Sequence, residues 1–218
     1  FGRLDNLNVP VIGSIYGYRI GQFGQVAKKM ASLKPAMIEV DISCPHMDYG
    51  KPYYADAELT AKVTKAVKNN SGKIPISIKL SPNVHDIKEI AHAAEKAGAD
   101  AITAINTATG MMIDIDAKKP ILANKIGGVS GPALKPIAVR CVYEIYDTVK
   151  IPIIGTGGIT YGKDAIEMVM AGATGIGIGT AIYYRGNDVL RKICNEMGVW
   201  MGKNRIKNLD EIRGAAHR

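Results

Sequence analysis

The chain has 218 residues, of which 47% are hydrophobic and 22% charged, with a formal net charge of +8, which supports one folded domain with a substantial core. No run of about 18 apolar residues could cross a bilayer, and the first residues lack a signal-peptide pattern, so we expect a soluble, cytoplasmic protein. The positive charge favours anionic ligands, but lysines and arginines are spread along the chain without a basic tract, which argues against nucleic-acid binding.

Short apolar stretches alternate with amphipathic helical patterns six times along the chain. The expected pairs of strand and helix are, in order, 9–16 and 20–33, 36–43 and 56–69, 74–80 and 84–97, 101–106 and 135–149, 151–155 and 163–171, and 175–180 and 188–197. A long loop through Asp114 and Gly127 separates the fourth strand from its helix. Gly98 is expected to close the third helix.

This alternation predicts an α/β fold with parallel strands covered by helices, either as a doubly wound sheet or as a barrel. Glycine-rich loops follow the last two strands, at 155–158 and 177–180, and such a pair is where TIM (β/α)8 barrels usually bind phosphate. We therefore favour a barrel. Only six units are present, and since the phosphate loops belong to the seventh and eighth strands, we expect the first two units to precede this chain. Residues 1–218 would then form one domain whose amino-terminal part is missing.

The stretch 38–46 reads Ile-Glu-Val-Asp-Ile-Ser-Cys-Pro-His and concentrates polar residues where a buried strand opens into a loop. Asp41, Ser43, Cys44 and His46 fall at this exit. A cysteine with a carboxylate, a hydroxyl and an imidazole nearby can act as an acid or base. The alternative is a small buried thiol beside a turn.

Two further strand exits carry candidate ligand-binding groups. Lys79 alternates with Ile78 and Leu80, so it should point away from them, toward an anion or an electron-rich cofactor. Asn106 and Thr107 follow the next strand and offer amide and hydroxyl groups, although an ordinary turn would look the same.

The late glycines indicate an anion site. Gly157 and Gly158 permit close approach of a ligand to backbone N–H groups. Gly179 and Thr180 form a similar glycine-containing loop one strand-helix unit later. Gly131 ends a third flexible, donor-rich loop that begins at Gly127. A loop that merely turns is the alternative for this third segment.

No metal or disulfide framework is expected from the cysteines, because Cys44, Cys141 and Cys194 form no CxxC motif and are odd in number. Cys141 and Cys194 lie in apolar-periodic helices and are predicted to pack in the core. Asp114 and Asp116 are two nearby acids, and a solvated loop is favoured over a metal site there.

Taken together, the motifs resemble those of the dihydroorotate dehydrogenase family. They are Asp-Ile-Ser-Cys-Pro-His (41–46), Lys-Leu-Ser-Pro-Asn-Val (79–84), Asn-Thr-Ala-Thr-Gly-Met-Met-Ile-Asp (106–114), Gly-Gly-Val-Ser-Gly-Pro (127–132) with Lys-Pro-Ile-Ala (135–138), Gly-Thr-Gly-Gly (155–158) and Ile-Gly-Thr-Ala (178–181). They follow the family order, and the 106–114 block is most similar to the NAD-linked branch of the class 1 enzymes.

The resemblance implies FMN-dependent oxidation of dihydroorotate to orotate in pyrimidine biosynthesis. Cys44 would remove the C5 proton while a hydride leaves C6 for the flavin. The implied pyrimidine-binding residues are Asp41, His46, Asn106 and Thr107. The implied FMN-binding residues are Lys79, Gly131, Gly157, Gly158, Gly179 and Thr180. The implied assembly is a homodimer or a hetero-oligomer with a subunit that carries FAD and an iron-sulfur cluster.

Two departures leave alternatives open. The family usually has Asn at the position of Asp41, and His46 stands where a second Asn is common, as in the related pyrimidine-reducing domain of dihydropyrimidine dehydrogenase. A flavin-free lyase or isomerase that uses Lys79 as a Schiff-base amine is a second class, although the sequence shows no second acid beside Lys79. A partner-binding subunit without activity is a third.

Overall fold

A central sheet of six parallel strands organises the computed structural model, which describes residues 4, 6, 8–43 and 52–218. The strands of this sheet are β1 (Ile12–Ile15), β2 (Met37–Asp41), β3 (Ile76–Leu80), β4 (Ala101–Ala104), β9 (Ile153–Thr156) and β10 (Gly175–Gly177). Each of the six predicted strands is present and shorter than predicted, although β9 ends one residue later than expected. Their spatial order follows the chain without a reversal. A doubly wound sheet would reverse its order at one point, so this single winding is that of a barrel wall.

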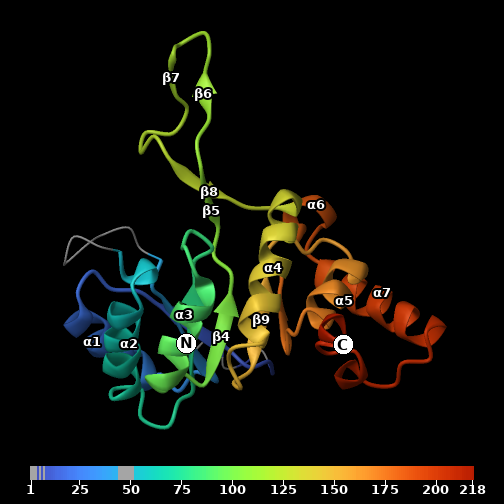
Figure 1. Cartoon of the computed structure of the whole chain (residues 1–218), viewed down its shortest axis with the longest axis horizontal. Coiled ribbons are helices and arrows are strands. Elements are labelled where there is room, and N and C mark those ends of the chain that lie inside the picture. The colour runs from blue at the N-terminus through green and yellow to red at the C-terminus, as the bar shows by residue number, and fades with distance from the viewer. Residues whose placement is uncertain (1–3, 5, 7, 44–51) are drawn as a thin grey trace.

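Helices follow the strands as predicted. They are α1 (Ile20–Ala31), α2 (Ala57–Lys68), α3 (Ile87–Lys96), α4 (Lys135–Tyr146), α5 (Gly162–Met170), α6 (Ala181–Arg185) and α7 (Val189–Lys203). α1, α2 and α3 lie side by side along one flank, and α4, α5 and α7 continue the layer on the other (Figure 1). α6 was not predicted, because its five residues are too few to show a helical period.

Local signals explain the helix ends. The Asp56 side chain caps α2 by accepting a hydrogen bond from the Leu59 amide at 3.0 Å, and Asp86 caps α3 through the Lys88 amide at 2.8 Å. Gly98 adopts φ +101° directly after α3, which confirms the predicted helix stop. None of the helices that the structure describes is both long and apolar enough to cross a membrane.

The helix-facing side of the sheet forms the main core. Ile38, Val40, Ile78, Leu80 and Ile102 are fully buried against the helices. Most residues of opposite parity on these strands are polar, Met37 and Ala101 excepted, so the other face of the sheet carries polar side chains. In β2 and β3 the polar positions are Glu39, Asp41, Ser77 and Lys79.

The sheet is open in the described part of the chain. β1 pairs only with β2, and β10 pairs only with β9, within those residues. Six sequential parallel strands agree with the barrel prediction to this extent, and closure by two further units stays a prediction.

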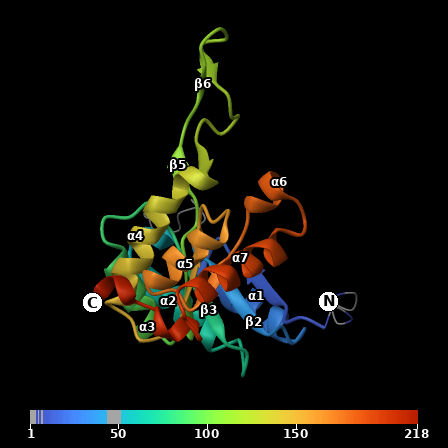
Figure 2. The ribbon, with the colours of Figure 1, turned by 90° about the vertical axis from the view of Figure 1, so that its right-hand side faces the viewer.

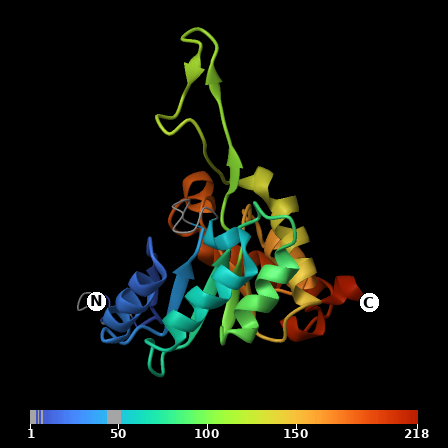
Figure 3. The same ribbon diagram turned by 60° about the vertical axis from the view of Figure 1, so that its left-hand side comes forward.

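An arm projects from the body between β4 and α4, where the sequence predicted only a long loop (Figures 1, 2 and 3). β5 (Ala108–Gly110) pairs with β8 (Gly127–Val129), and β6 (Ile113–Asp114) pairs with β7 (Lys119–Pro120), both antiparallel. These strands are two or three residues long, too short to show a period of two. Asp114 and Asp116 lie exposed in the arm, but Asp114 belongs to β6 and not to the predicted loop.

Candidate active site

The carboxyl ends of β2, β3 and β4 align side by side. The register places Asp41 opposite Lys79, and Lys79 opposite Thr103, on the polar face of the sheet. The Lys79 ammonium lies 3.5 Å from Glu39 Oε1, and both side chains are mostly buried. Glu39 is thus an acid beside Lys79 that sequence reasoning missed. The alternation Glu-Val-Asp was the available signal, since it puts Glu39 on the same face as Asp41.

Asp41 and Asn106 form one hydrogen-bonded cluster with Ser43. Asp41 Oδ1 accepts from the Ser43 amide at 2.9 Å and from the Ser43 hydroxyl at 2.5 Å. The Asn106 amide nitrogen donates to both Asp41 oxygens, at 3.4 and 3.3 Å, and to Ser43 Oγ. The Asn106 oxygen accepts from the Thr107 amide at 2.8 Å. The substrate-site candidates Asp41, Asn106 and Thr107 therefore come together although 65 residues separate the first two.

Asn83 joins the β3 exit to the base of the arm. Its amide nitrogen donates to Ser81 Oγ at 2.9 Å and to the Thr107 carbonyl at 3.1 Å, while its oxygen accepts from the Thr109 amide at 2.8 Å. A cavity of about 230 Å³ opens here. It is lined by Ser43, Tyr54, Ser81, Asn83, Asn106, Thr107, Thr109, Ile126, Gly127 and Gly128.

A neighbouring cavity of about 150 Å³ brings together the residues predicted to bind the cofactor. Lys79, Gly131, Gly157, Gly158, Gly179 and Thr180 all line it. These residues come from four separate strand exits, and only the tertiary fold makes them neighbours. Asn106 and Thr107 line both cavities, so the two spaces adjoin.

The glycine loops present unused hydrogen-bond donors to this second cavity. The backbone amides of Gly157, Gly158, Gly179 and Thr180 donate no hydrogen bond to any residue that the structure describes. Gly158 is buried, Gly157 and Thr180 are half-buried, and Gly179 is exposed. Four amides without a described partner on the lining of one cavity are suited to an anion.

Close packing requires glycine at Gly158. Its φ is +73°, and a Cβ atom there would lie 2.5 Å from the backbone nitrogen of Lys135. Gly157 is also left-handed, at φ +127°. The β9 exit can therefore pass close to the start of α4 and leave its amides directed at the cavity.

Two ion-pair networks hold these loops. Asp164 accepts from the amides of Thr160 and Tyr161, at 3.0 and 2.8 Å, and from Lys135 Nζ at 2.9 Å. Burial would raise the pKa of Asp164, but the hydrogen bonds from Lys135, Tyr161 and Thr160 hold it below its usual value. The hydrogen bond to Asp164 in turn raises the pKa of Lys135.

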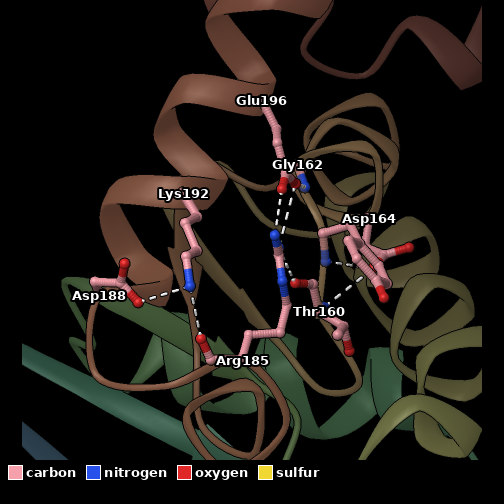
Figure 4. A network of polar contacts seen from close by, with 8 residues as sticks. Thr160, Gly162, Asp164, Arg185, Asp188, Lys192 and Glu196 are labelled. Carbon is pink, nitrogen blue, oxygen red and sulfur yellow. Dashed lines mark hydrogen bonds and ion pairs between the residues drawn. The ribbon is translucent and has the colours of Figure 1, made fainter.

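The second network joins α6 to α7 (Figure 4). Arg185 donates to the Thr160 carbonyl at 2.8 Å and to Glu196 at 2.5 Å, and Glu196 accepts from the Gly162 amide at 2.6 Å. Since α6 starts directly after Thr180, Arg185 ties the second glycine loop to the segment after the first one.

The cysteines are placed only in part. Cys44, the predicted catalytic residue, and His46 lie outside the described residues. Cys141 is buried in the core as predicted, and this burial raises the pKa of its thiol to about 11. The prediction of core packing for Cys194 is wrong, because this side chain is exposed on the outer side of α7. No group of three or more His, Cys, Asp or Glu among the described residues could hold a metal ion.

A cation, an amide cluster and amide donors without a described partner at the carboxyl ends of singly wound parallel strands are features of β/α-barrel enzymes that bind phosphorylated ligands. Residues 3–201 match the family model described as dihydroorotate dehydrogenase. The chain therefore belongs to the dihydroorotate dehydrogenase family, whose members are oxidoreductases.

Individual relatives support the same family membership. The chain is 49% identical over 216 residues to the catalytic subunit of dihydroorotate dehydrogenase B (NAD(+)) from Methanocaldococcus jannaschii. The matched residues cover 99% of this chain and 70% of the relative. The corresponding subunits from Methanothermobacter thermautotrophicus and Pyrococcus abyssi are 46% and 45% identical, over 99% and 98% of this chain and 71% of each relative.

Proposed function

We propose that this protein oxidises dihydroorotate to orotate in pyrimidine biosynthesis, with FMN as its cofactor. Family membership supports the reaction, and the two adjoining cavities supply a cofactor space and a substrate space. The observation that carries the proposal is the set of four backbone amides beside Lys79 that have no partner among the described residues. Such a set suits an anionic group joined to an electron-rich ring system.

The residues present fit FMN. The amides of Gly157, Gly158, Gly179 and Thr180 would hold its phosphate, and Lys79 would lie near the ring. Glu39 keeps the Lys79 ammonium on the polar face of the sheet. Gly131 approaches the Tyr184 hydroxyl, so the loop before α4 would close one side of the site. When bound, FMN supplies the two-electron acceptor for a hydride from C6 of the substrate.

The substrate would be held above Asn106 and Thr107. The Thr107 hydroxyl makes no hydrogen bond with a described residue and is available to a pyrimidine oxygen or nitrogen. The Asn106 amide is already engaged by Asp41 and Ser43, so Asn106 would be fixed in orientation before substrate arrives. His46 would add a further contact.

Cys44 is proposed as the base that removes the C5 proton. A thiol has a reference pKa near 8.5, so a modest downward shift makes it usable at neutral pH. Cys44 follows Ser43 directly in the sequence, and Ser43 lines the cavity proposed for the substrate.

Asp41 would determine which substrate the protein prefers. As an ionised carboxylate it accepts hydrogen bonds but cannot donate to a carbonyl oxygen, whereas the Asn usual in the family can do both. Together with His46, this favours a dihydropyrimidine without the orotate carboxylate as the second candidate substrate.

The wider assembly follows from the relatives. Those named above are catalytic subunits of NAD(+)-linked enzymes, which supports a partner subunit that carries FAD and an iron-sulfur cluster. We propose that residues 1–218 belong to a single FMN-binding barrel domain, completed by two preceding β/α units, in a cytoplasmic homodimer or hetero-oligomer.

Anaerobic titration with dihydroorotate tests cofactor and substrate together. The purified protein should show a flavin absorption band that bleaches on addition of dihydroorotate. Failure to take up FMN would remove the cofactor assignment. Bleaching by dihydrouracil but not by dihydroorotate would instead support the second substrate.

A Cys44→Ala variant tests the base. We expect turnover to fall by at least about 100-fold with FMN still bound, because a positioned base contributes about that much. Wild-type turnover in this variant would mean that another group removes the proton. Borohydride trapping of a substrate on Lys79 would support a Schiff-base reaction instead.

A further inference from the structure

A cavity of about 350 Å³ lies on the outer side of the molecule, between the start of α5 and the carboxyl-terminal half of α7. It is separate from the two cavities of the candidate active site. Its lining consists of Tyr161, Lys163, Glu196, Val199, Trp200 and Lys203. Its size falls in the range of small-molecule sites, which begins at roughly 300 Å³.

The lining combines aromatic rings with uncompensated positive charge. Trp200 packs against the buried cluster of Ile166 and Val169, so its ring is anchored while it faces the cavity. Tyr161 is 48% exposed. Lys163 and Lys203 are both exposed, and neither forms an ion pair within the described part of the chain.

The one carboxylate of the lining is already neutralised. Glu196 pairs with Arg185 at 2.5 Å and accepts from the Gly162 amide. Arg185 also lies over the Tyr161 ring, 4.5 Å from its centroid. The Lys163 ammonium lies over the same ring, 5.9 Å from its centroid. The cavity therefore offers aromatic rings and two ammonium groups that form no ion pair with a described residue, with little repulsion of an anion.

We propose that this cavity binds a planar aromatic anion of the nucleoside monophosphate class. The base would lie against the ring of Trp200, which suits stacking, with the Tyr161 ring and its Arg185 contact at the edge of the site. Lys163 and Lys203 would pair with the phosphate, because lysine ammonium groups bind phosphate as point charges.

The cavity is also linked to the glycine loops. In the segment 157–161, Gly157 and Gly158 line the cavity proposed for FMN, and Tyr161 lines the outer cavity. Arg185 connects the same segment, through the Thr160 carbonyl, to α6 and α7 (Figure 4). A ligand that moves Tyr161 or Glu196 would thus change the amides that face FMN. This coupling between the outer cavity and the FMN site rests on the proposed function, whereas nucleotide binding at the outer cavity does not.

Trp200 is the only tryptophan of the sequence, so its emission reports the site directly. The flavin-loaded protein is titrated with AMP and UMP, with adenosine and inorganic phosphate as controls. We expect saturable quenching by the nucleotides and at least about tenfold weaker binding of adenosine and of phosphate, since each control lacks half of the ligand. Unchanged emission with millimolar nucleotide, or equal binding of adenosine, overturns the proposal.

Variants locate the binding. Lys163→Gln with Lys203→Gln should weaken nucleotide binding by about tenfold, because two exposed charge pairs are lost. Lys150→Gln, an exposed lysine outside the cavity, should bind as the wild type does. Equal affinity in all three proteins places the nucleotide elsewhere and overturns the assignment.

The coupling between the outer cavity and the FMN site is measured separately, as the dissociation constant of FMN with and without saturating AMP. A change of about threefold or more that disappears in the double lysine variant supports it. An unchanged constant overturns the link but leaves the outer site standing. A protein that binds AMP and no FMN would contradict the proposed function alone.

Discussion

Side chains of the candidate site are held by partners from other strands of the sheet and from the next residue in the chain. Asn106 has a protein partner for both ends of its amide, and Lys79 has Glu39. Such groups are oriented before a ligand binds, so less rotational freedom is lost on binding. Gly157, Gly158 and Gly179 act differently, because their backbone amides have no hydrogen-bond partner among the residues that the structure describes.

A matched pair of substitutions separates these roles. Gly158→Ala should destabilise the fold by about 1–3 kcal/mol and weaken FMN binding, since φ is +73° and the new Cβ meets the Lys135 backbone. Gly179→Ala should leave the free energy of unfolding unchanged, because its Cβ meets nothing within 4 Å. Urea unfolding measures both. Equal stability of the two variants would show that Gly158 is not under this constraint.

Elements are joined at the candidate site by charged side chains rather than by apolar packing alone. Asp164 at the start of α5 holds Lys135 at the start of α4, and Arg185 of α6 holds Glu196 of α7. These contacts fix the loops between elements, which have few apolar side chains of their own.

The Asp164 contact predicts a pH dependence of stability. Its pKa is below 3.8 in the folded protein, so the carboxylate stabilises the fold above pH 3.8, and this contribution is lost as the pH falls through the folded pKa. Asp164→Asn should lower the free energy of unfolding at pH 7 by about 1–3 kcal/mol. Urea unfolding between pH 7 and pH 3 should show this deficit shrinking only at the acid end.

Glu144→Gln is the matched control for that series. Glu144 pairs with Arg140 one turn away on the surface of α4, and exposed pairs of this kind contribute about 0.5 kcal/mol. A deficit in Asp164→Asn that is as small as this, or that is constant with pH, would contradict the role assigned to Asp164.

At the scale of the whole molecule, the sheet and its helices form one core from which the arm stands apart (Figures 1 and 2). The arm carries eight exposed large apolar side chains. They are Met111, Met112, Ile113, Ile115, Ile121, Leu122, Ile126 and Val129. None of them belongs to the buried clusters, so the arm adds little to the stability of the chain.

Shortening the arm tests this division. Replacing residues 112–121 by an Asn-Gly turn should shift the melting temperature by less than about 4 °C, because these residues contribute less than about 1 kcal/mol to the free energy of unfolding. Ile78→Ala, a fully buried position, should cost about 2–5 kcal/mol. Circular dichroism melting compares the two. A collapse of the shortened protein would show that the arm supports the core.

The sequence by itself determined the six units, the parallel direction of their strands and the candidate residues at their exits. Alternation and glycine placement are local signals, and they identified Lys79, Asn106 and the glycine loops. It could not show that Glu39 faces Lys79, or that Asp41 bonds Asn106, because those contacts depend on the register of neighbouring strands. Exposure of Cys194 and pairing within the arm were also decided by tertiary packing. Side-chain contacts between strands are set by how whole elements align, and periodicity within one element carries no such information.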